Sequence, residues 1–446
     1  MKNVAINIVK KIQDAGYESY FAGGCVRDML MNVKPKDFDI VTSATPNEIK
    51  KIIDKTFDVG KKFGVIVANV DGHTFEIATF RGESEYKDSR HPEKIYFTNA
   101  IDDAKRRDFT INGMFYDPIR KKIIDYVNGE KDMENKIIRF IGNPNDRINE
   151  DHLRILRAIR FKNILNFSYD KRTWEAICTN AYRIESVSYE RISYELNQML
   201  ACANRSNALL DLSKSGILAY ILPEIDKMKG VPQPKEFHKE GDVFTHTIMA
   251  LKSLPDNAPL YLVWAVLLHD VGKVATLTIP KNNENDRIRF NKHAYYSAGI
   301  AAKICRRLKF PNTEREIIVW LVKNHMTIGD VEKMNVAKRR RFMLDYRIPA
   351  LLQLHKADAS GIVPKDLSMY KNLIEYYNDA KDFVKRQAAS EYNPLLTGKD
   401  IISNFNISQG PIIGEILSFV EEAHLNEKIK TKKEAIDYIK NYFKFY

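Results

Sequence analysis

The sequence predicts an α/β head followed by a longer region that is almost entirely helical. Short runs rich in β-branched and aromatic residues alternate with helical stretches up to about residue 140; they span 38–41, 65–70, 74–80 and 123–127. From residue 149 onward, apolar residues recur at spacings of three and four with short polar breaks. Prolines interrupt this pattern near residues 222–241, where we expect a domain boundary.

Length and composition limit the class of protein. At about 150 residues per domain, the 446-residue chain should hold about three domains. Its 44% hydrophobic and 29% charged residues exclude collagen-like and wholly disordered proteins. The net charge of +12 favours a polyanionic partner, with nucleic acid ahead of a membrane surface, although a merely basic surface would give the same value.

Several features bear on location. The four cysteines lie far apart and include no C-x-x-C pair, so a disulfide framework and a zinc ribbon are disfavoured. The longest apolar runs fall well short of the roughly 20 residues that span a bilayer. Val4, Ile8 and Ile12 recur at helical spacing, which predicts an amphipathic helix rather than a signal peptide. We therefore expect a cytoplasmic protein that does not associate with membranes.

Two aspartates follow a glycine turn in the head. Gly23 and Gly24 end an apolar run and begin a helical one that contains Arg27, a pattern typical of backbone that approaches a phosphate. Asp37 and Asp39 then stand two residues apart in a predicted strand, so both carboxylates face one side of it. Paired carboxylates suit Mg²⁺ and indicate phosphoryl or nucleotidyl transfer. Two solvated aspartates on a surface strand are the alternative.

Two further segments extend this candidate site. Glu76 lies between apolar residues on a predicted neighbouring strand; it either completes a metal cluster or is an edge-strand charge. In the segment 106–112, the guanidinium group of Arg107 matches triphosphate oxygens, while Asp108 and Asn112 suit a ribose hydroxyl. A solvated basic turn is the competing interpretation.

These motifs occur in the order and at the intervals typical of one family. With Gly-Gly-Cys-Val-Arg-Asp, Asp-x-Asp and Arg-Arg-Asp-Phe-Thr-Ile-Asn, the chain resembles a bacterial class II tRNA nucleotidyltransferase, or CCA-adding enzyme. The resemblance implies a head of the DNA polymerase β-like nucleotidyltransferase type, followed by an all-α neck, an HD-type body and a tail. It also implies an enzyme that builds or repairs the 3′ CCA end of tRNA from CTP and ATP without a nucleic-acid template.

The resemblance assigns roles to the head residues. It implies two Mg²⁺ ions held by Asp37 and Asp39, with Glu76 assisting. The residues implied for triphosphate binding are Gly24, Arg27 and Arg107.

A motif after the head resembles the base-selecting element of the family. Between residues 150 and 161, Asp151, Arg154, Arg157 and Arg160 recur at spacings of three, which predicts one stripe along a helix. A carboxylate and a guanidinium there can offer acceptors and donors to a base edge. The resemblance implies that Asp151 and Arg154 pair with the incoming C or A, and that the other two arginines help to hold the nucleotide or its triphosphate. A salt-bridged helix surface is the alternative.

The resemblance covers nearly the whole chain and implies four parts. These are a nucleotidyltransferase head (1–140), a helical neck (141–228), an HD-type body (229–365) and a tRNA-binding tail (366–446). Asp125, Gly129 and Asp132 match the family's hinge motif between head and neck. Basic clusters at 338–341 and 428–444 either neutralise tRNA phosphates or are solvated helix faces.

Enzymes that add only CC or only A, and poly(A) polymerases, carry the same catalytic motifs. The turn at 60–65 looks like the tRNA-specific form rather than the arginine-rich turn of bacterial poly(A) polymerases. The segment 81–92 resembles the flexible loop of enzymes able to add the terminal A. Full CCA addition is therefore favoured, with A-only addition and a poly(A) polymerase as alternatives. Gly113 departs from the family, which usually has alanine there.

A second group of metal-type residues lies in the helical region and resembles an HD-domain phosphohydrolase. The matching residues, in chain order, are His246, His269, Asp270 and Asp358. Such nitrogen and oxygen ligands suit Mn, Ni, Co or Mg. His293 and His325 are weaker candidates for a second metal, because a single histidine is more often packed or on the surface.

The function of this second group is open. An HD metal would activate water to hydrolyse phosphoesters such as 2′,3′-cyclic phosphates, as the resemblance implies; a retained but idle domain is the alternative. Two other classes also compete: a phosphohydrolase whose head only senses nucleotide, and a non-catalytic RNA-binding protein. The intact pair Asp37 and Asp39 argues against the last of these.

Overall fold

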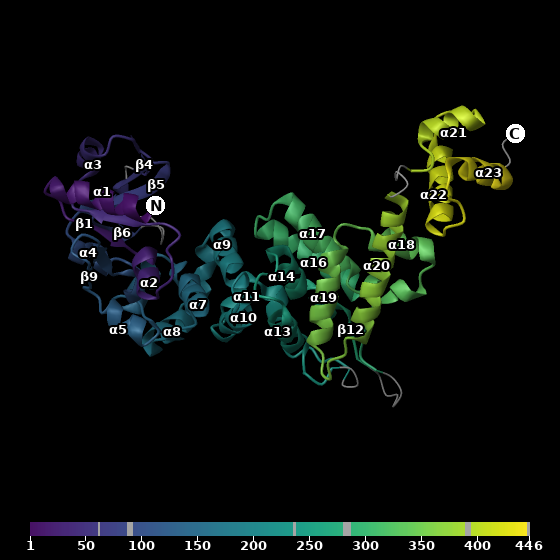
Figure 1. Cartoon of the computed structure of the whole chain (residues 1–446). Helices are drawn as coiled ribbons and strands as arrows, with labels where there is room; N and C mark the ends of the chain where they lie inside the picture. The colour runs from purple at the N-terminus through teal and green to yellow at the C-terminus, as the bar shows by residue number, and fades with distance from the viewer. Residues whose placement is uncertain (61–62, 87–91, 235–237, 280–286, 389–393, 444–446) are drawn as a thin grey trace. The chain divides into compact units, whose positions relative to one another are not determined.

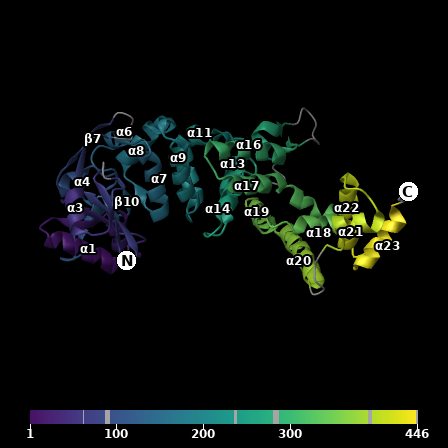
Figure 2. The same cartoon turned by 90° about the horizontal axis from the view of Figure 1, so that it is seen from above.

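The computed structural model describes residues 1–60, 63–86, 92–234, 238–279, 287–388 and 394–443. Its contacts divide the chain into two compact units, Met1–Pro223 and Glu224–Tyr446. Figures 1 and 2 show the elements of both units in two views. We describe each unit by itself.

The first unit begins with the α/β part, which we call the head. Its elements are α1 (Lys2–Asp14), β1 (Ser19–Ala22), α2 (Gly24–Leu30), β2 (Asp39–Thr42), α3 (Pro46–Ile52), β3 (Thr56–Phe57), β4 (Val65–Val70), β5 (His73–Thr79), β6 (Arg81–Tyr86), β7 (Pro92–Phe97), α4 (Ala100–Lys105), the 3₁₀ helix η2 (Thr110–Asn112), β8 (Phe115–Asp117), β9 (Lys122–Ile124) and α5 (Gly129–Glu134).

A seven-stranded sheet in the order β3-β4-β5-β2-β1-β8-β9 organises the head. Strands β2 and β5 are parallel, and the other neighbours are antiparallel. Strands β6 and β7 form a separate hairpin. The predicted α/β head is thus confirmed, and the flexible-loop prediction falls partly on residues 87–91, outside the described residues, as do residues 61–62 of the turn at 60–65.

The two faces of the sheet differ. Ile40 and Ile77 point to one face, where they pack with Ile8 of α1 and Ile49 of α3 in the main core of the head. The opposite face carries a smaller core that includes Val41 and residues of α4. Because side chains alternate along a strand, Asp39 and Glu76 point to this second face.

The alternation predicted around the two aspartates is confirmed. Phe38 and Ile40 are buried, whereas Asp37 and Asp39 keep exposed surface, although the Asp39 carboxyl group itself is partly desolvated. The strand is shorter than predicted, because β2 begins at Asp39 and Asp37 lies in the segment that leads into it.

The helical remainder of the first unit, which we call the neck, follows the head. Its elements are β10 (Ile137–Ile138), α6 (Pro144–Glu150), α7 (Arg154–Leu165), β11 (Ser168–Tyr169), α8 (Lys171–Thr179), η3 (Ala181–Ser186), α9 (Tyr189–Leu200), α10 (Arg205–Lys214) and α11 (Ile217–Ile221); α12 (Pro223–Asp226) follows at the division between the units.

The prediction of one helical stripe that includes Asp151 is wrong. Helix α6 ends at Glu150, the backbone of Asp151 is extended (φ −149°, ψ 106°), and α7 begins only at Arg154. The Asp151 carboxylate accepts a hydrogen bond from the Leu153 amide at 3.0 Å, a local bond that competes with helix formation. Only the three arginines of the motif therefore share α7.

The second unit is helical apart from one small hairpin among its described residues. Its elements are α13 (Val243–Ser253), α14 (Leu260–Leu268), α15 (Lys273–Thr276), β12 (Leu277–Thr278), β13 (Arg289–Phe290), α16 (His293–Arg307), α17 (Asn312–Asn324), η4 (Thr327–Lys333), α18 (Val336–Met343), α19 (Ile348–Ser360), α20 (Ser368–Ala388), α21 (Gly398–Phe405), α22 (Pro411–Leu425) and α23 (Lys432–Tyr442).

Within this unit, α14 packs against α13, α17 and α19, and α16 packs against α17. Helices α21 to α23 share a separate small core that includes Ile401, Ile416 and Ile439. None of the described helices combines the length and the apolar composition that crossing a bilayer requires.

One arginine of the basic cluster at 338–341 packs in the protein interior. Arg340 is 7% exposed and donates to Asp379 at 3.0 and 3.2 Å and to the Leu425 carbonyl at 2.8 Å. Its guanidinium also lies 4.4 Å from the centre of the Phe383 ring. This arginine therefore joins α18 to α20 and to the end of α22 instead of facing solvent.

We expect Arg340→Ala to destabilise the protein by about 2–3 kcal/mol, because it removes charge-assisted hydrogen bonds and leaves a buried carbonyl without its donor. The midpoint of thermal unfolding should fall by several degrees in calorimetry of the full chain. Arg341→Ala is the matched control; it removes an exposed pair with Glu421 and should cost about 0.5 kcal/mol or less. Equal effects of the two substitutions would contradict the assignment.

Candidate active site

Three carboxylates gather on the open face of the head sheet. The parallel strands β2 and β5 are paired so that Ile40 lies beside Ile77. Asp39 and Glu76, which precede these two residues, therefore also lie side by side. Burial, then the charges of Asp37 and Glu76, raise the pKa of Asp39 to about 6, although Arg107 opposes the shift. Such mutual repulsion is what a bound divalent cation relieves, so the three side chains fit a hard metal ion.

The glycine turn lies against the same site. Gly23 adopts the left-handed region (φ 69°) just before α2, and a Cβ atom there would lie 3.5 Å from Arg107 Nη1 and 3.7 Å from Asp39 Oδ2. Asp103 holds the Arg107 guanidinium with two hydrogen bonds of 3.0 and 3.2 Å. The glycine-turn backbone and the Arg107 guanidinium thus lie together and both suit a bound phosphate group, and the Asp39 carboxylate lies beside them.

A chain of hydrogen bonds joins α2 to α7. Arg27 Nη1 donates to Asn112 Oδ1 at 2.9 Å, and the Asn112 amide donates to Asp108 Oδ1 at 3.3 Å. The other oxygen of Asp108 accepts from Arg157 at 2.8 and 2.5 Å. Burial opposes ionisation of Asp108, but Arg157 and Arg154 outweigh it and lower the pKa of Asp108.

Phe161 is a residue that the sequence analysis did not single out. The guanidinium groups of Arg27, Arg157 and Arg160 lie 5.3, 5.3 and 4.3 Å from the centre of its ring. Stacking on one buried aromatic ring fixes the three planar cations relative to each other. The only sequence signal was its position immediately after the arginine stripe.

The other charged residues of the motif at 151–160 have partners as well. Asp151 accepts from Arg191 of α9 at 2.7 Å. Arg154 pairs with Glu150 and donates to the Arg106 carbonyl at 3.2 Å. Helix α9 therefore braces this motif, and its Glu195 also accepts from Arg160 at 3.0 Å.

The second unit brings all six metal-type residues predicted for the HD region together. One group comprises His246, His269 and Asp358, and the other comprises Asp270, His293 and His325; within each, the ligand-type atoms lie within 4.8 Å of one another. Oxygens of the Asp270 carboxylate face both groups, with Oδ2 at 3.3 Å from His269 Nε2 and Oδ1 at 3.4 Å from His293 Nε2. The two histidines that seemed weak candidates thus lie beside the aspartate.

The chemistry of this cluster fits divalent cations. His269 Nε2 is buried and has no hydrogen-bond partner among the described residues, which suits a metal ligand. Burial and His269 lower the pKa of His325 to about 3, which favours its neutral, metal-binding form. Burial opposes ionisation of Asp270, but His269 and Lys273 outweigh it and hold its pKa well below the usual value.

Glu240 and His238 lie behind this cluster and were not among the predicted residues. Glu240 Oε1 lies 2.6 Å from His238 Nδ1 and 3.2 Å from His246 Nδ1. The sequence offers no local signal for this contact beyond the six-residue spacing between Glu240 and His246.

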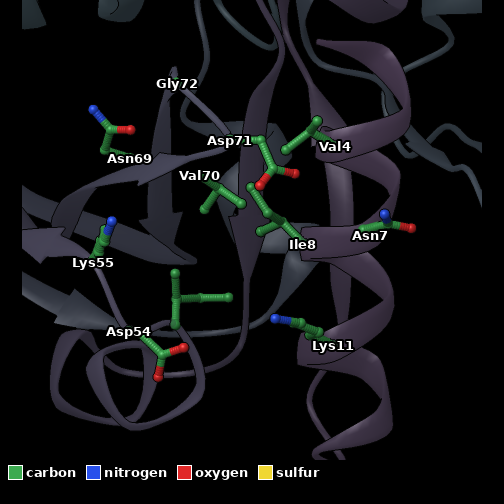
Figure 3. Close-up of a pocket in the computed structure, with 11 residues that line it drawn as sticks. Val4, Asn7, Ile8, Lys11, Asp54, Lys55, Asn69, Val70, Asp71 and Gly72 are labelled. Carbon is green, nitrogen blue, oxygen red and sulfur yellow. The ribbon is translucent and has the colours of Figure 1, made fainter.

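A separate pocket lies between α1 and the turn joining β4 and β5 (Figure 3). Its polar lining includes Lys11, Lys55, Asp54 and Asp71, which carry charges of both signs. None of the predicted site residues lines it, so it carries no part of the chemistry described above.

Comparison with known proteins agrees with the order of the parts. The model described as "Poly A polymerase head domain" matches residues 19–139, the model "Probable RNA and SrmB- binding site of polymerase A" matches 166–229, and the model "HD domain" matches 243–359. The CCA-adding enzyme of Ligilactobacillus salivarius is 41% identical over 438 residues, which cover 97% of this chain and 94% of that protein. The chain belongs to the CCA-adding enzyme family. Members of this family are tRNA nucleotidyltransferases.

Other members of the CCA-adding enzyme family also match along the whole chain. The enzyme of Geobacillus sp. is 30% identical over 434 residues, covering 97% of this chain and 95% of that protein. The crystal structure of the Bacillus stearothermophilus CCA-adding enzyme in complex with CTP has a TM-score of 0.74 at 24% identity and covers 98% and 96% of the two chains. The resemblance inferred from the motifs is thus confirmed, as is the polymerase β-like head with an HD domain.

Proposed function

We propose that this chain adds CCA to the 3′ end of tRNA from CTP and ATP, with catalysis at Asp37 and Asp39. The observation that carries the proposal is the placement of three carboxylates beside the glycine turn and Arg107 on the open face of the head sheet. Mg²⁺ held by Asp37 and Asp39, with Glu76 nearby, would activate the 3′-hydroxyl and stabilise the charge of the departing pyrophosphate.

The protein groups have separable roles in this proposal. Arg107 and the Gly23–Gly24 backbone bind triphosphate oxygens, and the Arg27–Asn112–Asp108 chain holds the ribose end of the nucleotide near α7. Asp151 and Arg154 present an acceptor and donors to the base, with Arg157 and Arg160 held by Phe161 to bind the nucleotide. The four-part division at 140, 228 and 365 is the organisation that we propose for these roles.

Titration of substrates tests the activity. The purified protein, Mg²⁺ and a tRNA transcript that lacks CCA are incubated with CTP, ATP or both, and the products are sized. We expect two added residues with CTP and a stop after three with both. Addition of one A only to CC-ended tRNA would indicate an A-adding enzyme instead, and a long ATP-dependent tail would indicate a poly(A) polymerase.

We expect Arg154→Ala to impair the choice of nucleotide more than the chemistry. It removes donors that face a base edge, and each well-formed bidentate pair contributes about 1–3 kcal/mol of discrimination. The ratio of kcat/KM for the correct over the incorrect nucleotide should therefore fall about tenfold or more, while Mg²⁺-dependent addition persists. Arg183→Ala, which removes a cation of η3 that bonds Asn180, is the control. Unchanged discrimination by Arg154→Ala would remove this residue from base selection.

A second activity is favoured by the HD cluster. We propose that the six residues hold divalent cations and hydrolyse phosphoesters such as 2′,3′-cyclic phosphates, because Asp270 lies between two groups of ligand-type atoms. Incubating the metal-free protein with 2′,3′-cyclic AMP and Mn, Ni, Co or Mg in turn tests this activity. An absence of hydrolysis with every metal would leave the domain without a catalytic role.

A further inference from the structure

His246 lies between two carboxylates that contact opposite ring nitrogens. Its Nε2 atom lies 2.9 Å from Asp358 Oδ1, inside the HD cluster, and its Nδ1 atom lies 3.2 Å from Glu240 Oε1, outside the cluster. The side chains of both His246 and Glu240 have no exposed surface. The ring is thus held from behind by a carboxylate that faces away from the cluster.

The hydrogen bonds of Glu240 determine the proton position on His246. A carboxylate only accepts hydrogen bonds, so the Nδ1 atom that faces Glu240 carries a proton. Nε2 faces the Asp358 carboxylate at 2.9 Å, so in the metal-free protein it holds a second proton. A cation that binds between His246 and Asp358 displaces this proton and takes the Nε2 lone pair, while Nδ1 keeps its proton on Glu240. Metal ions bind this lone pair, so the tautomer set by Glu240 is the one that can ligate a cation.

The backbone holds Glu240 itself in place. Its second oxygen, Oε2, accepts from the Val363 amide at 3.0 Å, and the Lys239 amide donates to the Val363 carbonyl at 3.3 Å. Val363 follows α19, the helix that carries Asp358. One carboxylate therefore joins the segment before α13 to the end of α19, so that the two helices supplying His246 and Asp358 are fixed together.

We propose that Glu240 is a positioning residue that fixes His246 in the Nδ1–H tautomer and so prepares Nε2 to bind a divalent cation together with His269 and Asp358. Carboxylate–histidine pairs of this kind orient metal ligands and raise their basicity. The proposal deepens the proposed HD function and rests on it. His238 shares the carboxylate without belonging to the cluster, which makes it the matched control.

The test compares Co²⁺ binding by the metal-free full chain with that of three variants. Histidine-bound Co²⁺ has a visible absorption band, so titration reports this site directly. In Glu240→Gln the amide group can donate to Nδ1, which moves the histidine proton to Nε2 and blocks ligation. We expect Co²⁺ affinity to fall about 10- to 100-fold. Glu240→Asp restores a carboxylate and should recover part of this loss, whereas His238→Gln should change affinity less than about threefold.

A second readout follows the proton itself. In protein labelled with ¹⁵N-histidine and loaded with diamagnetic Zn²⁺, the shifts of His246 should indicate a protonated Nδ1 and a metal-bound Nε2 in the parent, and the loss of this pattern in Glu240→Gln. A purely structural role would not change the tautomer in a folded variant. Thermal unfolding and nucleotide addition by the head check that each variant is folded, and Glu240→Asp keeps the test valid if the glutamine variant does not fold.

The outcomes distinguish the role of Glu240 from the proposed metal binding by the HD cluster. Parent-like Co²⁺ affinity and an unchanged tautomer in Glu240→Gln would overturn the role of Glu240 while leaving the metal site in place. If His246→Ala also binds Co²⁺ as tightly as the parent, or the parent shows no histidine-bound Co²⁺, the HD cluster is no metal site and both proposals fail.

Discussion

Nucleotide addition should be abolished when Asp39 is replaced by asparagine. The substitution keeps the shape of the side chain but removes a carboxylate that the proposed mechanism uses to hold Mg²⁺. Metal-ion stabilisation of a phosphoryl-transfer transition state contributes several kcal/mol, and each 1.36 kcal/mol is a factor of ten in rate. We therefore expect kcat for CTP and ATP incorporation to fall at least about 10³-fold, measured by extension of a tRNA that lacks CCA.

The fold should tolerate this change. Burial and the charges of Asp37 and Glu76 raise the pKa of Asp39 to about 6. A carboxyl group whose pKa rises on folding destabilises the metal-free fold once it ionises, and this loss accumulates as pH rises from the unfolded value through about 6. At pH 8 without Mg²⁺, Asp39→Asn should therefore unfold at an equal or higher temperature than the parent.

Asp71→Asn is the matched control for this prediction. Asp71 is exposed in the turn between β4 and β5, where its left-handed backbone (φ 49°) is one that asparagine also adopts. Its activity should equal that of the parent. Parent-level extension by Asp39→Asn would mean that the head carboxylates do not catalyse the reaction.

The second large effect is expected at Asp270 in the HD cluster. Its two oxygens face His269 and His293, which belong to different groups of ligand-type atoms. Asp270→Asn should thus weaken metal binding at both groups and abolish phosphoester hydrolysis, while addition of CCA by the head persists. Metal content after dialysis and hydrolysis of 2′,3′-cyclic AMP measure the two losses.

Asp270→Asn also removes a charged partner of Lys273, an effect that is distinct from the loss of metal. Lys273 donates to Asp270 at 2.7 Å and to Gln233 at 2.8 Å, so the asparagine variant leaves a buried ammonium with one fewer charged partner. His325→Gln avoids this problem and should remove one of the two metal equivalents. Asp330→Asn, at an exposed surface pair, should change neither readout. Retention of both metal equivalents in Asp270→Asn would contradict the involvement of Asp270 in both groups.

Local patterns were sufficient where the chemistry depends on neighbours in the chain. The alternation of Asp37 and Asp39 with Phe38 and Ile40 predicted which carboxylates face away from the core, and the structure confirms that placement. The β4 run and the N-terminal amphipathic helix were predicted for the same reason. Strand and helix periods are properties of consecutive residues, so a sequence records them directly.

The sequence pattern gave a wrong prediction where a hydrogen bond between a side chain and the nearby backbone prevented the helix that the residue spacing predicted. The spacing of three placed Asp151 on a helix with Arg154, but its carboxylate bonds the backbone two residues on and the helix starts later. In the basic run at 338–341, which predicted either phosphate-binding or solvated cations, long-range contacts decide the place of Arg340: it is buried and paired with Asp379 and the Leu425 carbonyl.

The order of the motifs, the α/β head and its helical continuation were predictable from sequence patterns, as were the carboxylates and histidines of the two candidate sites. Which of these side chains lie together depends on the tertiary fold. His246 and Asp358 are 112 residues apart, and Glu240, Phe161 and Val363 acquire their roles through contacts of this kind. Such distances are set by the packing of helices that are far apart in the sequence. The spacing of residues along one helix or strand does not predict them, because each contact depends on how whole elements pack together.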